Sequence, residues 1–213
     1  MNTQKVREIL NLENLMAMDI APFVSLTQSV WGLGSPRFYA MLNALASCLE
    51  EDEIYLEVGA YHGASAISAL INNNLQSYLI DIFETNSSLA ILESNLKRFN
   101  VFERANIFEM TFQEFFSSHV PEEFKVGLYY YDGSHTTEST TLGLSLGFPY
   151  VTLGGIIVAD DISWQEVSLG INKFIGSFWD KVTILYSTNP KEMPQPPDEE
   201  WWAGTIVLQK IKE

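Results

Sequence analysis

Basic residues are scarce in this sequence. Twelve Lys and Arg stand against 27 Asp and Glu, which gives a formal net charge of −15 at pH 7. Proteins that bind phosphate backbones or acidic membrane surfaces need a positively charged face. We therefore expect no nucleic-acid partner and no membrane partner.

Cysteine and long apolar runs are also nearly absent. Cys48 is the single cysteine, so no disulfide can form within the chain, and a reducing compartment is the simpler interpretation. No segment approaches the roughly 20 apolar residues of a membrane-spanning helix, and the first residues lack the basic stretch and apolar run of a secretion signal. We expect a cytoplasmic protein.

Short apolar runs rich in β-branched and aromatic residues recur along the chain, and stretches with helical periodicity separate most of them. The runs predict seven buried strands. They are Ile54–Val58, Tyr78–Phe83, Ala105–Met110, Val126–Tyr131, Gly155–Ala159, Val182–Ser187 and Thr205–Gln209.

Three patterns predict helices, one before the first strand and two between later strands. Ser35 and Pro36 have the residue types of an N-cap and a first helical position. Thr111 and Glu114 have capping-box spacing, which predicts a short helix after the third strand. A third helix has one apolar face, formed by Leu89, Leu92, Leu96 and Phe99.

Alternating strands and helices predict an α/β fold, with a mostly parallel sheet covered by helices on both faces. The last two strands are joined only by a loop from Thr188 to about Glu200, and its four prolines exclude a crossover helix. The last strand should therefore run antiparallel to its neighbour. Trp201 and Trp202 follow this loop, and we interpret them as core residues rather than as a lid or an interface.

The first strand leads into a glycine turn, EVGAYHGAS. Glu57 ends the strand, and Gly59 and Gly63 bracket a tight turn into a helix. Glycines let the backbone approach a ligand closely, and the helix N-terminus offers free N–H groups. The G-x-x-x-G spacing differs from the G-x-G-x-x-G of dinucleotide-binding folds.

Together with this turn, YYYDGSH after the fourth strand and LGGIIVADD through the fifth give the chain a strong likeness to one family. The sequence resembles the class I S-adenosylmethionine (SAM)-dependent methyltransferases, over about residues 36–210. Within that class it is most similar to the small metal-dependent O-methyltransferases that act on catechols, phenylpropanoids or sugar hydroxyls. The resemblance implies a Rossmann-like sheet in residues 36–213, preceded by a helical or lid segment in residues 1–35.

The resemblance also implies a cofactor site for SAM. Asp81 would accept hydrogen bonds from both ribose hydroxyls, with Glu84 as the alternative. Thr111 and Phe112 would lie beside the adenine, although Thr111 is interpreted equally well as a helix cap. The remaining implied cofactor contacts are Glu57, Gly59, Ala60, Gly63 and Asp132.

Three carboxylates should meet at the ends of the fourth and fifth strands: Asp132, Asp160 and Asp161. Unneutralised, they would repel one another, so either a carboxyl group keeps its proton or a divalent cation (magnesium, manganese or calcium) is bound. The related enzymes commonly carry Asn at the third position, where this chain has Asp161. The alternative role for Asp160 and Asp161 is to cap a helix that begins near Ser163.

His135 lies three residues after Asp132, where some sugar-hydroxyl enzymes of the family carry histidine. A neutral imidazole can accept a proton from a hydroxyl group, particularly from one whose pKa a cation has lowered. We predict His135 to be the general base, with Asp132 beside it in the catalytic site. The alternative is an ordinary loop histidine, and we interpret His62 as a cofactor-flanking or structural residue.

These features predict SAM-dependent O-methylation of a small-molecule hydroxyl. Two alternatives stay open: a metal-independent N- or C-methyltransferase, and a non-catalytic protein that keeps the fold. We interpret Tyr129, Tyr130 and Tyr131 as core rather than pocket wall, and Trp164 and the loop around Trp201 are candidate pocket walls. The stretch from Ile20 to Ser35 would close over the ligands or form a homodimer contact.

Overall fold

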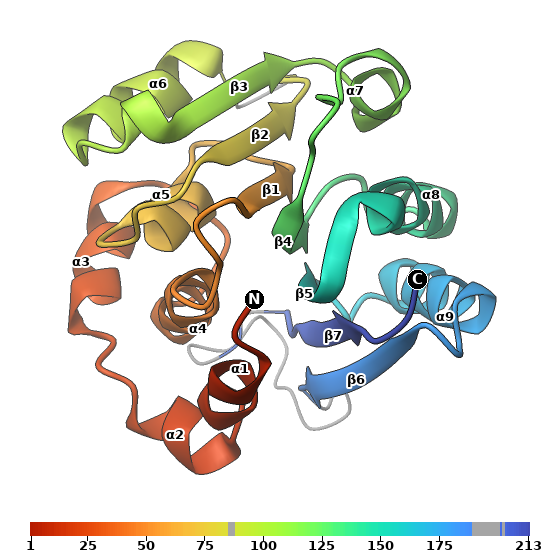
Figure 1. Cartoon of the computed structure of the whole chain (residues 1–213). Helices are drawn as coiled ribbons and strands as arrows, with labels where there is room; N and C mark the ends of the chain where they lie inside the picture. Colours follow the sequence, from red (N-terminus) through yellow and green to blue (C-terminus); the bar gives the residue numbers. More distant parts are fainter. Residues whose placement is uncertain (85–87, 189–200, 202) are drawn as a thin grey trace.

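A seven-stranded sheet forms the centre of the molecule in the computed structural model, which describes residues 1–84, 88–188, 201 and 203–213 (Figure 1). The strand order is β3-β2-β1-β4-β5-β7-β6. β7 pairs antiparallel with both β5 and β6, and the other pairs are parallel. The predicted Rossmann-like α/β fold is confirmed. The proline-rich loop and Trp202 lie outside the described residues.

All seven predicted strands are present. Their bounds are β1 Ile54–Val58, β2 Ser77–Asp81, β3 Ala105–Glu109, β4 Val126–Tyr131, β5 Val151–Ala159, β6 Val182–Ser187 and β7 Ile206–Lys210. β2 ends at Asp81 instead of Phe83, because Phe83 has a φ of 51° and its amide turns back to donate to the Asp81 carboxylate. β5 begins four residues earlier than predicted, at Val151, where it pairs with Val126.

Helices cover both faces of the sheet, with α4–α6 on one and α7–α9 on the other (Figure 1). The two predicted N-terminal caps are observed: the hydroxyl of Ser35 caps α4, and that of Thr111 caps α7 within a full capping box. The hydroxyl of Ser88, which was not predicted as a cap, caps α6. The α-helices are α1 Thr3–Ile9, α2 Leu12–Ala17, α3 Ala21–Ser29, α4 Pro36–Ala46, α5 Ala64–Leu70, α6 Leu89–Arg98, α7 Phe112–Ser118, α8 Thr137–Gly147 and α9 Gln165–Ser177. Short 3₁₀ turns occupy Phe102–Arg104 and Phe148–Tyr150.

The N-terminal segment packs onto the sheet domain. Val6, Leu15 and Leu26, from α1, α2 and α3, are buried in the same apolar core as the residues of α4 and α5. Residues 1–35 therefore share a core with the sheet. Among the described helices, none combines the length and the apolar character of a membrane span.

The aromatic stretch of β4 is core, as predicted. Tyr130 is buried on the face covered by α4–α6, whereas Tyr129 and Tyr131 are buried on the face covered by α7–α9. Successive side chains alternate between the faces of a strand, so both faces receive an aromatic ring from the same segment. Trp201 is also buried, and its ring packs against Tyr186, which agrees with the interpretation of Trp201 as core.

Candidate active site at the carboxyl edge of the sheet

Two neighbouring cavities lie beyond the carboxyl ends of the parallel strands, where open α/β sheets bind ligands. The larger, of about 410 Å³, reaches from the glycine turn to His135 and Trp164. The smaller, of about 370 Å³, lies beside Thr111 and Phe112. Gly59, Asp81 and Asp132 line both cavities. An elongated ligand could therefore lie across the ends of β2, β1 and β4.

The glycine turn connects β1 to α5 where the backbone of β4 comes very close. A Cβ atom at position 59 would lie 2.0 Å from the carbonyl oxygen of Asp132, and Gly59 has a φ of +94°. At position 63 a Cβ would lie 2.5 Å from Leu92 Cδ1, again with a positive φ, +88°. Only glycine fits both the space and the backbone conformation at these two positions.

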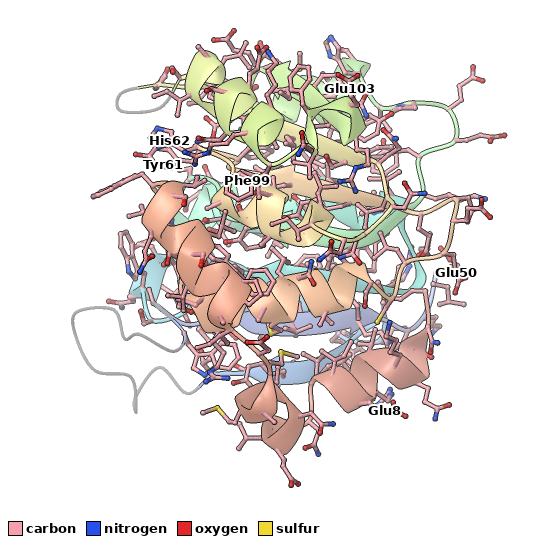
Figure 2. The ribbon with its side chains drawn as sticks, turned by 90° about the vertical axis from the view of Figure 1, so that its left-hand side faces the viewer. Glu8, Glu50, Tyr61, His62, Phe99 and Glu103 are labelled. Atoms are coloured by element: carbon pink, nitrogen blue, oxygen red, sulfur yellow. The ribbon has the colours of Figure 1, made fainter. Side chains whose placement is uncertain are left out.

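Tyr61 and His62 form the tip of this turn. Their rings stack, with centroids 3.9 Å apart, and both residues line the larger cavity. Figure 2 shows them at one end of the sheet, with Glu50 at the opposite end. The placement of His62 agrees with a cofactor-flanking or structural role.

Asp81 is tied to the glycine turn by its carboxylate. Oδ2 accepts a hydrogen bond from the backbone amide of Tyr61 at 2.7 Å, and Oδ1 accepts one from the amide of Phe83 at 2.7 Å. A carboxylate has about four lone-pair positions, so each oxygen can still accept from a ligand hydroxyl. Glu84, the alternative ribose ligand, is exposed and lies outside the described lining of both cavities.

Glu57 is completely buried behind the cavity wall. Its carboxyl group accepts hydrogen bonds from Tyr55 Oη at 2.8 Å and from Ser65 Oγ, and Ser65 lines the larger cavity. Burial raises the pKa of Glu57 to about 8, and the negative charges of Asp132 and Asp81 act in the same direction. Ser65 thus lies between Glu57 and the cavity, and the Ser65 hydroxyl is the group through which Glu57 would act on a ligand there.

Thr111 and Phe112 line the smaller cavity, where the adenine was expected. The capping interpretation of Thr111 is also correct, because its hydroxyl accepts from the Glu114 amide while the Glu114 carboxylate accepts from the Thr111 amide. Ala60 is buried in the wall of the larger cavity. Thr111 therefore caps α7 and lines the smaller cavity at the same time, and Phe112 lies beside it in the cavity wall.

The three predicted carboxylates and His135 come together at the ends of β4 and β5, which are paired in parallel. Asp132, His135 and Asp161 each offer an atom within 4.8 Å of the others, an arrangement that could hold a metal ion. His135 Nε2 lies 2.7 Å from Asp161 Oδ2 and 3.7 Å from Asp132 Oδ1. Asp160 is connected to this group through Tyr130, whose hydroxyl donates to Asp160 Oδ2 at 2.9 Å and to Asp132 Oδ2 at 3.1 Å.

The capping alternative for the aspartate pair is not supported by the structure. α9 begins at Gln165, its N-cap is Trp164, and no side chain caps it. Asp161 instead has a φ of +58°, unusual for a residue other than glycine, and directs its carboxylate to His135. Residues other than glycine with a positive φ are found more often at functional sites than elsewhere.

The charges of this cluster change the protonation of its members. Burial, together with the charges of Asp132 and Asp161, raises the pKa of Asp160 well above its usual range. Contacts with the carboxylates of Asp132 and Asp161 raise the pKa of His135 to about 10. Without another positive charge nearby, the imidazole is therefore protonated at neutral pH and cannot act as a base.

Tyr39 was not predicted to line the cavity, whereas Trp31 and Leu33 lie in the stretch from Ile20 to Ser35 that was expected to close over the ligands. Trp31 and Leu33, in the connection between α3 and α4, are 69% and 57% exposed and line the larger cavity. Tyr39, at the start of α4, also lines it, and burial raises the pKa of its hydroxyl. The sequence around Tyr39 has the pattern of an ordinary buried helix face, so no local signal distinguishes Tyr39 as a cavity residue. Trp164, a predicted pocket wall, is 51% exposed and packs beside His135 with ring centroids 4.8 Å apart.

Comparisons with known proteins agree with this fold. A family model described as a methyltransferase domain matches residues 56–162. Among solved structures, the O-methyltransferase TomG from Streptomyces achromogenes, involved in tomaymycin synthesis and solved in complex with SAM, is similar with a TM-score of 0.67. It has 11% identity, with 100% of each chain covered. The O-methyltransferase from Bacillus cereus in complex with SAH has a TM-score of 0.62 and 13% identity, with 98% of this chain and 90% of that chain covered. Comparison with curated proteins gave no significant match.

Proposed function

Because the chain belongs to the methyltransferase domain family, we propose that it transfers the methyl group of SAM to a hydroxyl oxygen of a small molecule, with the help of a divalent cation. Its fold is that of the class I SAM-dependent methyltransferases. The observation that carries the proposal is the meeting of Asp132, His135 and Asp161 in the same cavity as Gly59 and the ribose-ligand candidate Asp81.

The cofactor would lie across the two cavities. Asp81 would hold the ribose hydroxyls, Phe112 would pack beside the adenine, and the glycine turn would accommodate the amino-acid end. SAM, when bound, supplies an electrophilic methyl group carried on a sulfonium. The chain's part is to hold an acceptor oxygen in line with that group, which lowers the entropic cost of the reaction.

The carboxylate cluster fits a divalent cation. Within the described residues, Asp160 Oδ1 is buried and has no hydrogen-bond partner, and buried polar atoms without partners are rare in proteins. Asp132, Asp160 and Asp161 would hold the ion, and carboxylate oxygens suit magnesium, manganese or calcium. Such an ion, when bound, lowers the pKa of a hydroxyl group that it contacts.

His135 is the proposed general base. It can accept a proton only when Asp132 and Asp161 are paired with another positive charge, since their contacts otherwise keep the imidazole protonated. A charge of that kind among the carboxylates would leave the ring neutral at pH 7. The proton of the acceptor hydroxyl would then pass to His135 as the new oxygen–carbon bond forms, while the bond between the methyl carbon and sulfur breaks and SAH leaves.

Calorimetry with SAH, the demethylated product, tests the cofactor part of the proposal. We expect binding by the purified protein, and its absence in well-folded protein would overturn the proposed activity. Turnover on an identified acceptor should stop on chelation and return with Mg²⁺ or Mn²⁺. Turnover that survives complete removal of metal would instead favour a metal-independent methyltransferase.

His135→Ala tests the base. We expect unchanged SAH affinity and a 10²- to 10⁴-fold lower kcat, the range of general acid–base contributions. His119→Ala is the matched control, because His119 is exposed at the end of α7 and outside the described lining of both cavities. Equal kcat values for His135→Ala and the unmodified enzyme would rule out His135 as the base.

A further inference from the structure

A single tyrosine hydroxyl joins the two strands that carry the acidic cluster. Tyr130 Oη donates to Asp160 Oδ2 at 2.9 Å and to Asp132 Oδ2 at 3.1 Å. Asp132 follows β4 and Asp160 follows β5. The phenol has one hydrogen to share, so both contacts depend on the same hydroxyl orientation.

The ring of Tyr130 is held firmly in place. It is 2% exposed on the α4–α6 face of the sheet, and it packs against Phe38 of α4 with ring centroids 5.4 Å apart. A rigid donor of this kind fixes the rotation of the carboxylates that it contacts.

The same hydroxyl selects which oxygen each carboxylate presents. Both Oδ2 atoms are occupied by Tyr130, which leaves Oδ1 of Asp132 and Oδ1 of Asp160. Oδ1 of Asp132 faces His135 Nε2 at 3.7 Å. Oδ1 of Asp160 is buried and has no partner among the described residues. One oxygen of each carboxylate is thus left available for a cation.

We propose that Tyr130 is a positioning residue of the cation site, whose hydroxyl orients Asp132 and Asp160 so that their Oδ1 atoms are presented to the ion. This inference rests on the proposed function, in which the carboxylates hold a divalent cation. Hydrogen-bond partners behind metal ligands generally change metal affinity 10- to 100-fold when they are removed. Tyr130 lines the larger cavity, but in this role its hydroxyl acts through Asp132 and Asp160.

Tyr130→Phe removes the hydroxyl and keeps the ring. Tyr129→Phe is the matched control: its hydroxyl is also buried in β4, but it donates to the Gly143 carbonyl on the other face of the sheet. Calorimetric titration of each metal-free protein with MnCl₂ should give a 10- to 100-fold weaker Kd for Tyr130→Phe. Tyr129→Phe should remain within about twofold of the unmodified chain.

Two further measurements separate positioning from a general structural role. SAH affinity should be unchanged in Tyr130→Phe, because the partners of the hydroxyl are Asp132 and Asp160 and not the ribose-ligand candidate Asp81. Turnover on an identified acceptor should recover at high Mn²⁺ concentration, with a raised apparent KM for the metal and a kcat near that of the unmodified enzyme. If Tyr130→Phe does not fold, 4-fluorophenylalanine at this position fills the space without donating.

A Kd for Mn²⁺ within about twofold of the unmodified protein in Tyr130→Phe would overturn the inference. Equal losses in Tyr129→Phe and Tyr130→Phe would also overturn it, because the effect would then come from the core. If the unmodified protein binds SAH but not Mn²⁺, both the cation in the proposed function and the positioning role of Tyr130 would be ruled out. Absence of SAH binding, in contrast, would count against the methyl transfer itself.

Discussion

The backbone amide of Tyr61 donates to Oδ2 of Asp81 at 2.7 Å, which ties the glycine turn after β1 to the end of β2. The contact holds the carboxylate at the junction of the two cavities. The ribose-binding role predicted for Asp81 and the shape of the glycine turn therefore depend on the same side chain.

Asp81→Ala should weaken SAH binding about 10- to 100-fold, because a hydrogen bond to a charged group contributes about 1.5–3 kcal/mol. Isothermal titration calorimetry measures the change. Glu84→Ala is the control, since Glu84 is exposed beyond the same strand, and it should bind SAH like the unmodified chain. A larger loss in Glu84→Ala than in Asp81→Ala would reverse the assignment of the ribose ligand.

Gly59→Ala should destabilise the fold by at least about 2 kcal/mol, because overpacking and a positive φ each cost about 1–3 kcal/mol. The added Cβ would meet the Asp132 carbonyl oxygen at 2.0 Å. Gly176→Ala, in α9, meets no atom within 4 Å and should be neutral or stabilising by up to about 1 kcal/mol. Urea unfolding compares the two, and similar stabilities would contradict the close approach of β1 and β4.

Glu57 should make the free energy of unfolding depend on pH. Its pKa is about 8 in the folded protein and near 4.5 in the unfolded chain. Between these values the unfolded chain releases the proton that the folded protein keeps, so stability falls as pH rises through this window. The loss is on the order of a few kcal/mol.

Glu57→Gln should flatten that slope between about pH 5 and pH 8, as measured by urea unfolding at a series of pH values. Glu103→Gln, at an exposed site labelled in Figure 2, should keep the slope of the unmodified protein. A slope unchanged by Glu57→Gln would show that the pH dependence arises elsewhere.

Trp31 and Trp164 should bind the acceptor. Both are more than half exposed at the rim of the larger cavity, and contacts between aromatic rings contribute about 0.5–1.5 kcal/mol. Trp31→Ala or Trp164→Ala should raise the KM for an identified acceptor about 2- to 10-fold and leave SAH affinity unchanged. Trp179→Ala is the control, because Trp179 is 76% exposed and outside the described lining of this cavity. A change in SAH affinity alone would mean that the two rings contact the cofactor.

Local sequence patterns were sufficient for the framework. Buried strands such as Val126–Tyr131 were found to the residue, because unbroken apolar runs leave few alternative structures. The caps at Ser35 and Thr111 were found because capping depends on residues within one helical turn. The ends of β2 and β5 were less accurate: β2 ends early at a local turn in which Phe83 has a positive φ, and the start of β5 depends on its long-range pairing with Val126.

Contacts between distant residues were harder to predict. The convergence of Asp132 with Asp161 followed from strand adjacency. The hydrogen bonds of the Tyr130 hydroxyl were not predicted, because Tyr130 lies in a stretch that was correctly interpreted as core. The protonation of His135 depends on two carboxylates from different strands, which no local pattern reports. Trp31 lies in the stretch that was expected to close over the ligands or form a dimer contact, but its individual place at the cavity rim depends on how α3 and α4 pack.

The pairing of β4 with β5 has a consequence for insertions and deletions. Its register is irregular near Val126 and continuous from Leu128 to Tyr131, directly before the carboxylates. An extra residue before Leu128 could be absorbed where the ladder is already interrupted. An extra residue after Leu128 would turn every following side chain to the opposite face and separate Asp132 from Asp160. Changes in chain length should therefore accumulate at the amino end of this strand pair and be eliminated at its carboxyl end.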